Sequence, residues 1–179
     1  TSKQAENTMY TLTVNGVKDN AGNSIAADAK YDFLSFALTA GYLKFEIWSN
    51  IGGTPVQNLL DDPRYPASPD FVAATTSFNT RPVYGDDSHE NYGGVMSGYL
   101  TPTETDDYDF FIGSDDASQL FISTDEKPEN LSTLPIAEET GCCDAFHEVG
   151  DPETTAAPIH LEAGQKYFVK AIWKEGGGG

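Results

Sequence analysis

Two adjacent carboxylates, Asp115 and Asp116, are the side chains of this sequence best suited to hold a metal ion. They lie in a short acidic turn, residues 114–118, between two runs rich in aromatic and β-branched residues, which favour strands. Because successive side chains of a strand point to opposite faces, both carboxylates reach one ion only where the intervening backbone is bent or cis. Ca²⁺, which takes about six to eight oxygen ligands, would hold them together. The alternative is a solvated acidic hairpin turn that binds nothing.

The two cysteines, Cys142 and Cys143, are adjacent and therefore cannot join distant segments. Ordinary disulfides need Cα atoms at least about 4.4 Å apart, whereas a trans peptide places neighbours about 3.8 Å apart. The alternatives are a vicinal disulfide, which would rigidify a sharp turn, and two free thiols in a loop. If the chain is exported to an oxidising compartment, the disulfide is favoured over two free thiols, and the vicinal disulfide is the state that we expect. A thiolate metal site would lack the usual second pair of ligands.

Nothing in the sequence gives positive support to catalysis. The histidines His89, His147 and His160 are scattered and do not have the spacing of metal ligands. There is no Gly-x-Ser-x-Gly elbow and no phosphate-binding loop. We therefore expect a protein that is not an enzyme.

The composition is strongly acidic, with 28 acidic against 10 basic side chains and a formal charge of −18 over 179 residues. This charge argues against nucleic acid and against anionic membrane surfaces as partners, because both need positive charge. It suits solubility in salt, or cation binding, although most of these carboxylates are expected only to solvate the surface. No apolar run reaches the roughly 18 residues of a membrane-spanning helix, so we expect no membrane insertion.

The sequence predicts that the elements that position the carboxylates are short strands. Prolines exclude regular helix around residues 63–69, and only residues 56–60 suit a short helix. Short strands separated by turns every 8–12 residues or so are typical of a sandwich or barrel. The sequence therefore predicts an all-β, antiparallel fold. The strands expected with most support are residues 94–100, 108–112, 119–123, 157–161 and 167–173.

The first 38 residues differ from the rest. Residues 10–14 alternate apolar and polar side chains, Asn15-Gly16 predicts a turn, and residues 31–38 suit a closing strand. The segment resembles the last hairpin of a bacterial immunoglobulin-like repeat and is too short to bury a core alone. We expect residues 1–38 to be the tail of such a domain or a linker hairpin, with a boundary within 37–41. The alternative is an extra hairpin packed on the main sandwich.

Several motifs of residues 43–179 resemble the anthrax protective-antigen domain family in order and spacing. They are the strand and turn 97–102, the strand–Ser-Asp-Asp–strand core 108–123, the strand–turn–strand 159–167 and the glycine run 174–179. The resemblance implies that residues 42–179 form an antiparallel, barrel-like β-sandwich. In the family a further strand follows the glycine run, so we expect the last strand to be missing from this chain.

Domains of this family are attached to glycosidases, adhesins and other cell-surface proteins. In its yeast adhesin branch, paired aspartates hold a Ca²⁺ ion that contacts sugar hydroxyls, and Asp115 and Asp116 occupy the matching positions. The resemblance implies a Ca²⁺-dependent carbohydrate-binding or adhesion module of a larger exported protein, at the cell surface or outside the cell. Its partner would be a glycan or cell-surface polysaccharide. The alternative is a structural spacer or protein-interaction module, contacting neighbouring domains of the same polypeptide, in which Ca²⁺ only adds stiffness.

The remaining ligands are expected from the loop that follows Ser123, because a later loop completes the site in the adhesin branch. Asp144 or Asn130, with backbone carbonyls, would complete the shell. Aromatic side chains usually supply an apolar face for a sugar, but they also dominate sandwich interiors, so each candidate has both interpretations. These candidates are Trp48, Tyr92, Phe146 and Trp173.

Overall fold

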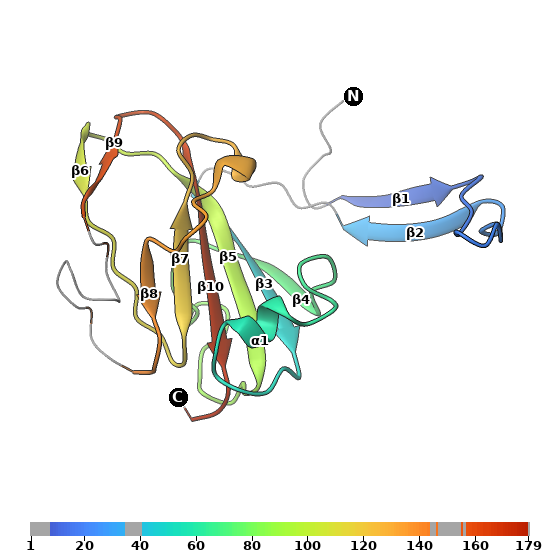
Figure 1. Ribbon diagram of the computed structural model, residues 1–179, viewed down its shortest axis with the longest axis horizontal. Helices are drawn as coiled ribbons and strands as arrows, with labels where there is room; N and C mark the ends of the chain where they lie inside the picture. The colour runs from blue at the N-terminus through green and yellow to red at the C-terminus, as the bar shows by residue number, and fades with distance from the viewer. Residues whose placement is uncertain (1–7, 35–40, 144–145, 147–154, 156, 179) are drawn as a thin grey trace. The chain divides into compact units, whose positions relative to one another are not determined.

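The computed structural model describes residues 8–34, 41–143, 146, 155 and 157–178 (Figure 1). The chain divides into two compact units, Thr1–Thr39 and Ala40–Gly179. The elements are β1 (Met9–Val14), β2 (Ala29–Leu34), β3 (Leu43–Ser49), α1 (Gln57–Leu60), β4 (Phe71–Thr75), β5 (Tyr92–Leu100), β6 (Asp106–Tyr108), β7 (Ser118–Ile122), a 3₁₀ turn η1 (Pro128–Asn130), β8 (Ala137–Glu139), β9 (Ile159–Leu161) and β10 (Tyr167–Glu175).

The first unit is a two-stranded antiparallel sheet. β1 pairs with β2, with Met9 opposite Leu34 and Val14 opposite Ala29. The connection is fixed by Asp19, whose Oδ1 accepts hydrogen bonds from the backbone N–H groups of Ala21 and Asn23, both at 2.9 Å. Residues 35–38 of the predicted closing strand lie outside the described residues. Membership of an immunoglobulin-like domain stays a prediction.

The second unit is built on a six-stranded antiparallel sheet with the strand order β4-β3-β5-β10-β7-β8. Figure 1 shows β10 running between β5 and β7, so the last strand of the chain is central in the sheet. The close packing of the Trp173 side chain of β10 against β5 depends on Gly94. A Cβ atom there would lie 2.1 Å from Cζ2 of Trp173, so only glycine lets this indole lie against β5.

A second, smaller layer covers part of the sheet. β6 and β9 pair antiparallel, with Asp106 opposite Leu161. Leu161 is buried in one cluster with Leu120 of β7 and Val169 of β10, and Tyr108 packs against that cluster. The predicted all-β, antiparallel sandwich is thereby confirmed. Of the described helices, α1 has four residues and η1 has three. In the described part of the chain, no helix has the length and apolarity to span a membrane.

The acidic turn does not close a hairpin, as the alternative interpretation of it would require. Residues 108–112 and 119–123 do not pair; β6 ends at Tyr108 and pairs with β9, while β7 pairs with β10 and β8. The alternation still predicts the correct faces, because Phe110 and Ile112 pack against the core while Phe111 is exposed. Strand propensity reports how well a side chain fits a half-buried pleated surface and leaves the pairing partner open.

The predicted strand 157–161 is shorter in the structure, where β9 covers Ile159–Leu161. Pro158 has no backbone N–H to donate to a neighbouring strand, which accounts for the later start.

Candidate functional site: a carboxylate cluster at the end of β10

The acidic turn is fixed on β10 by backbone hydrogen bonds. Asp116 N–H donates to the carbonyl of Lys174 at 2.8 Å, and Lys174 N–H donates to the carbonyl of Ala117 at 2.9 Å. The Ser114 hydroxyl donates to the Asp116 carbonyl at 2.5 Å. These bonds place the turn beside the end of β10, and Asp116 is only 7% exposed. Asp116 therefore does not point to solvent as a free hairpin turn requires.

Three carboxylates converge at this point. The peptide bond between Asp115 and Asp116 is cis, and one carboxylate oxygen of each lies within 4.8 Å of the other and of a Glu175 oxygen. The Oδ2 atom of Asp116 accepts a hydrogen bond of 2.8 Å from Gly176 N–H. A Cβ atom at Gly176 would lie 3.2 Å from that oxygen, so a larger residue would press on the carboxylate. The glycine run thus positions Asp116.

Glu175 is the least exposed of the three carboxylates. It is 6% exposed, and its buried Oε1 atom has no hydrogen-bond partner among the described residues. Burial raises the pKa of Glu175 to about 7, and the negative charges of Asp115, Asp116 and Glu90 add to that shift. A backbone hydrogen bond from Gly177 lowers this pKa in part, but the Oε1 atom is left without a donor to stabilise its charged form.

One buried cation lies beside the cluster. Lys174 has no exposed surface, and its Nζ atom donates to the carbonyls of Tyr92 and Glu175, both at 2.9 Å. Burial lowers the pKa of Lys174, while the charges of Asp116 and Glu175 act in the opposite direction. The ammonium offsets part of the negative charge of the cluster.

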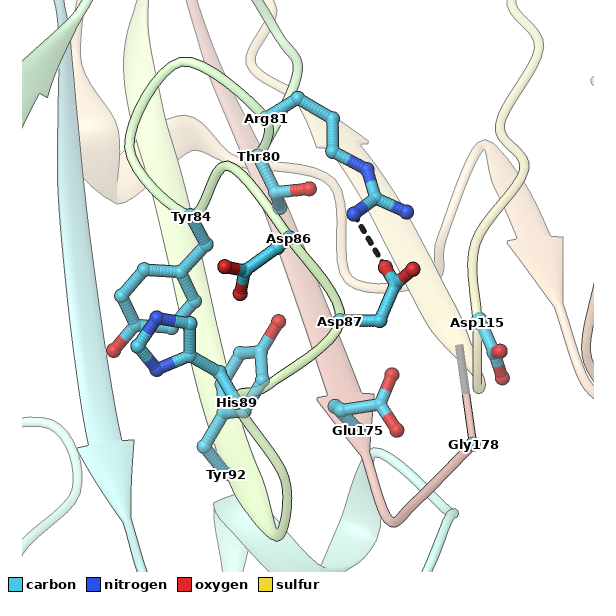
Figure 2. Close-up of a pocket in the computed structure, with 10 residues that line it drawn as sticks. All are labelled: Thr80, Arg81, Tyr84, Asp86, Asp87, His89, Tyr92, Asp115, Glu175 and Gly178. Atoms are coloured by element: carbon cyan, nitrogen blue, oxygen red, sulfur yellow. Dashed lines mark ion pairs between the residues drawn. The ribbon is translucent and has the colours of Figure 1, made fainter.

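A polar cavity of about 120 Å³ adjoins the cluster, and Figure 2 shows Asp115 and Glu175 at its edge. Its other walls come mainly from the segment between β4 and β5. There Arg81 forms an ion pair with Asp87, and the Tyr84 ring stacks on His89 with centroids 3.8 Å apart. A water occupies about 30 Å³, so the space suits an ion with a few waters or part of a hydroxyl-rich ligand.

The predicted vicinal disulfide is present. Cys142 and Cys143 are joined, and Cys143 N–H donates to the carbonyl of Ser114 at 2.9 Å. The disulfide turn is thereby attached directly before Asp115. The sulfur atoms also lie near the Asp115 carboxylate, but a disulfide has no thiolate to offer a metal.

The structure does not bring the expected Asn130 to the aspartates. Asn130 ends η1, in the loop that follows the far end of β7, and its Nδ2 donates to Asp125 at 2.8 Å. Asp144 lies outside the described residues. The sequence analysis missed Glu175, because it assigned the residue to the approach to a glycine run. A usable signal was the alternation in β10, which puts Glu175 on the same face as the buried Trp173.

The aromatic candidates fall into two groups. Trp48, Trp173 and Tyr92 are 1%, 5% and 8% exposed and belong to the core, although Tyr92 also lines the polar cavity. Phe146 is 71% exposed, with its ring 6.3 Å from Phe111. Of the four, Phe146 alone presents a largely exposed ring.

Comparison with known proteins gives distant relatives. The chain matches no protein-family model. It is 23% identical over 133 residues to fibrocystin-L of Mus musculus, which covers 74% of this chain and 3% of that protein. It is 22% identical over 139 residues to N-acetyl-beta-glucosaminyl-glycoprotein 4-beta-N-acetylgalactosaminyltransferase 1 of Mus musculus, covering 75% of this chain and 13% of that protein. The chain thus spans a small part of each of these relatives.

Among solved structures, the chain is similar to the A domain of epithelial adhesin 9 from Candida glabrata, determined in complex with Galb1-4GlcNAc. The sequence identity is 14% and the TM-score 0.48, and the match covers 76% of this chain and 77% of that one.

Proposed function

We propose that residues 42–179 form a non-catalytic, protective-antigen-type module that binds Ca²⁺ through Asp115 and Asp116 and binds carbohydrate through the ion. The observation that carries the proposal is the convergence of these two carboxylates with the buried Glu175, within 4.8 Å, beside an open polar cavity.

A cation resolves two unfavourable features of this arrangement. Like charges at this separation repel, and a buried carboxylate oxygen without a hydrogen-bond donor is costly. A cation between the three oxygens removes both costs. An all-oxygen donor set selects a hard ion, and Ca²⁺ accepts irregular shells of about six to eight ligands, whereas Mg²⁺ demands near-octahedral geometry.

Carbohydrate fits the unfilled part of such a shell. Sugar hydroxyls are neutral oxygen ligands that replace bound waters, and the adjoining cavity offers the carboxylates and guanidinium of Asp86, Asp87 and Arg81 for further hydrogen bonds. A glycan partner is supported by one distant relative, whose name describes a transferase acting on a glycoprotein. A disulfide beside the site fits a module at the cell surface or outside the cell.

A structural spacer is the second candidate function. It is favoured by the bond from Gly176 N–H to Asp116, which already ties the acidic turn to the end of β10. An ion at this place would stiffen the end of the sheet without any glycan, and the partners would then be neighbouring domains of the same polypeptide.

Calorimetric titration of the chelator-stripped chain with Ca²⁺ tests the ion site. We expect heat of binding in the parent, its loss in Asp116→Ala, and unchanged binding in Asp125→Ala, which removes a carboxylate at the other end of β7. Equal binding in all three proteins, or none in the parent, would contradict the proposal.

A glycan array probed with and without chelator separates the two functions. A carbohydrate-binding module gives signals that chelator abolishes and Ca²⁺ restores. A spacer binds Ca²⁺ in the calorimeter and gives no glycan signal in either condition.

A further inference from the structure

The end of β10 supplies the residue that completes the ion site. We infer that Glu175 is the third carboxylate ligand of the cation, in the place that the sequence assigns to Asn130 or Asp144. The inference rests on the proposed Ca²⁺ site and extends it, because it moves the third ligand from a loop to the central strand of the sheet.

The separation of the oxygens fits one shared ion. Ca²⁺–oxygen distances are about 2.3–2.6 Å, so two oxygens bound to one ion lie at most about 5 Å apart. One oxygen from each of Asp115, Asp116 and Glu175 satisfies this limit, since all three lie within 4.8 Å of one another.

The burial of Glu175 separates it from an ordinary surface carboxylate. Its Oε1 atom is shielded from solvent and has no partner among the described residues. The nearest buried cation does not fill this role, because the ammonium of Lys174 donates to the carbonyls of Tyr92 and Glu175. When it is ionised, a carboxylate oxygen in this setting is stabilised by a positively charged partner, and a metal ion is one.

The charges of the buried group match a divalent ion. With Glu175 ionised, three carboxylates and the Lys174 ammonium leave two negative charges, which one Ca²⁺ neutralises. The neighbouring Glu90 stays outside this count, because its carboxylate is not one of the three whose oxygens lie within 4.8 Å of one another. Glu90 is therefore a matched control, a nearby glutamate whose carboxylate instead accepts a hydrogen bond from Gly178 N–H at 3.1 Å.

The first test compares the Ca²⁺ affinities of Glu175→Gln and Glu90→Gln by calorimetry on the full chain. The two changes remove the same charge near the same site. We expect the affinity to fall about tenfold or more in Glu175→Gln, because a ligand is weakened, and to stay within about threefold in Glu90→Gln, because the charge acts only through space. Far-ultraviolet dichroism checks that each variant is folded.

The possible outcomes separate the inference from the proposal beneath it. Ca²⁺ binding by the parent, its loss in Asp116→Ala, and equal affinities in the two glutamine variants would overturn the role of Glu175 and leave the ion site standing. No binding by the parent overturns both. Glu175→Asp, which withdraws the carboxylate by one methylene and keeps the charge, supplies a second variant and should also bind more weakly than the parent.

The second test counts the waters on the ion. Tb³⁺ replaces Ca²⁺ at oxygen sites, and its luminescence lifetime in H₂O and D₂O reports the number of bound waters. Removing a ligand in Glu175→Ala should add at least one water, and Glu90→Ala should add none. An unchanged water count in Glu175→Ala, with Tb³⁺ bound, contradicts the inference even if the affinity falls.

Discussion

Acidic residues lie at both ends of β7, but the carboxylates at the two ends differ in their hydrogen-bond donors. Beyond Ile122, Asp125 accepts hydrogen bonds of 2.8 Å from Lys127 N–H and from the Asn130 side chain. Before Ser118, three carboxylates converge, and the Oε1 atom of Glu175 has no donor among the described residues. In the first loop Asp125 has its donors, whereas at the second place one buried carboxylate oxygen, Glu175 Oε1, is left without a donor among the described residues. The supply of donors, more than the number of acidic residues, therefore distinguishes a cation site from an acidic turn.

The largest effect that would sharpen this comparison is the pH dependence of the cation-free chain. Burial raises the folded-state pKa of Glu175 from 4.5 to about 7, and the negative charges of Asp115, Asp116 and Glu90 add to this shift. The Lys174 ammonium lies beside the same carboxylates. Between these two values the folded chain binds more protons than the unfolded chain, so stability falls as the pH rises through this window. The free energy of unfolding falls by about 3 kcal/mol across this window, because a difference of one in pKa corresponds to about 1.36 kcal/mol.

Urea unfolding in chelator over this pH range measures the effect. In Glu175→Gln the side chain cannot titrate, so the free energy of unfolding should change less with pH than in the parent. Parallel pH profiles for the two proteins would show that Glu175 has the same pKa in the folded and unfolded chains. Burial would then not disfavour its ionised form, which would contradict the prediction.

The second prediction concerns stabilisation by Ca²⁺. An ion that binds only the folded chain stabilises it by about 2.7 kcal/mol at a concentration one hundred times its dissociation constant. We expect this gain in the parent and in Asp125→Ala, because Asp125 already has its donors, and no gain in Asp116→Ala. Urea unfolding at neutral pH with and without Ca²⁺ measures it. If Asp125→Ala loses the gain and Asp116→Ala keeps it, the two ends of β7 have been assigned the wrong way round.

The smallest predicted effect is that of a methyl group at Gly176. Its Cβ would lie 3.2 Å from Asp116 Oδ2 and 3.1 Å from Thr54 Cγ2, so the carboxylate must shift by a few tenths of an ångström. We expect Gly176→Ala to lower the Ca²⁺ affinity severalfold, because ligand geometry is displaced. Gly52→Ala is the control, since its nearest neighbour would be Asn91 Oδ1 at 3.8 Å. Equal affinities in the two variants would show that the glycine run does not position Asp116.

Local patterns in the sequence were sufficient for the fold class and for part of the site. Alternation with a period of two and punctuation by turn residues depend only on neighbours along the chain, so they predict β5, β7 and β10 closely. The adjacency of Asp115 and Asp116 is likewise visible without a structure, as is that of Cys142 and Cys143. The all-β class and the vicinal disulfide were predicted correctly for this reason.

The other features of the site, namely which carboxylates meet and which loops lie near them, were decided by pairing between strands that are distant in the sequence. The turn at Asp116 and the end of β10 are 60 residues apart along the chain at their shared hydrogen bond, and they meet only because β7 pairs with β10. The same pairing excludes a hairpin between residues 108–112 and 119–123. It also buries Glu175 beside the two aspartates and leaves Asn130 at the opposite end of β7. Strand propensity is a property of single residues on a pleated surface, whereas the choice of partner depends on the packing of the whole sheet, so the third carboxylate could be recognised only in the folded chain.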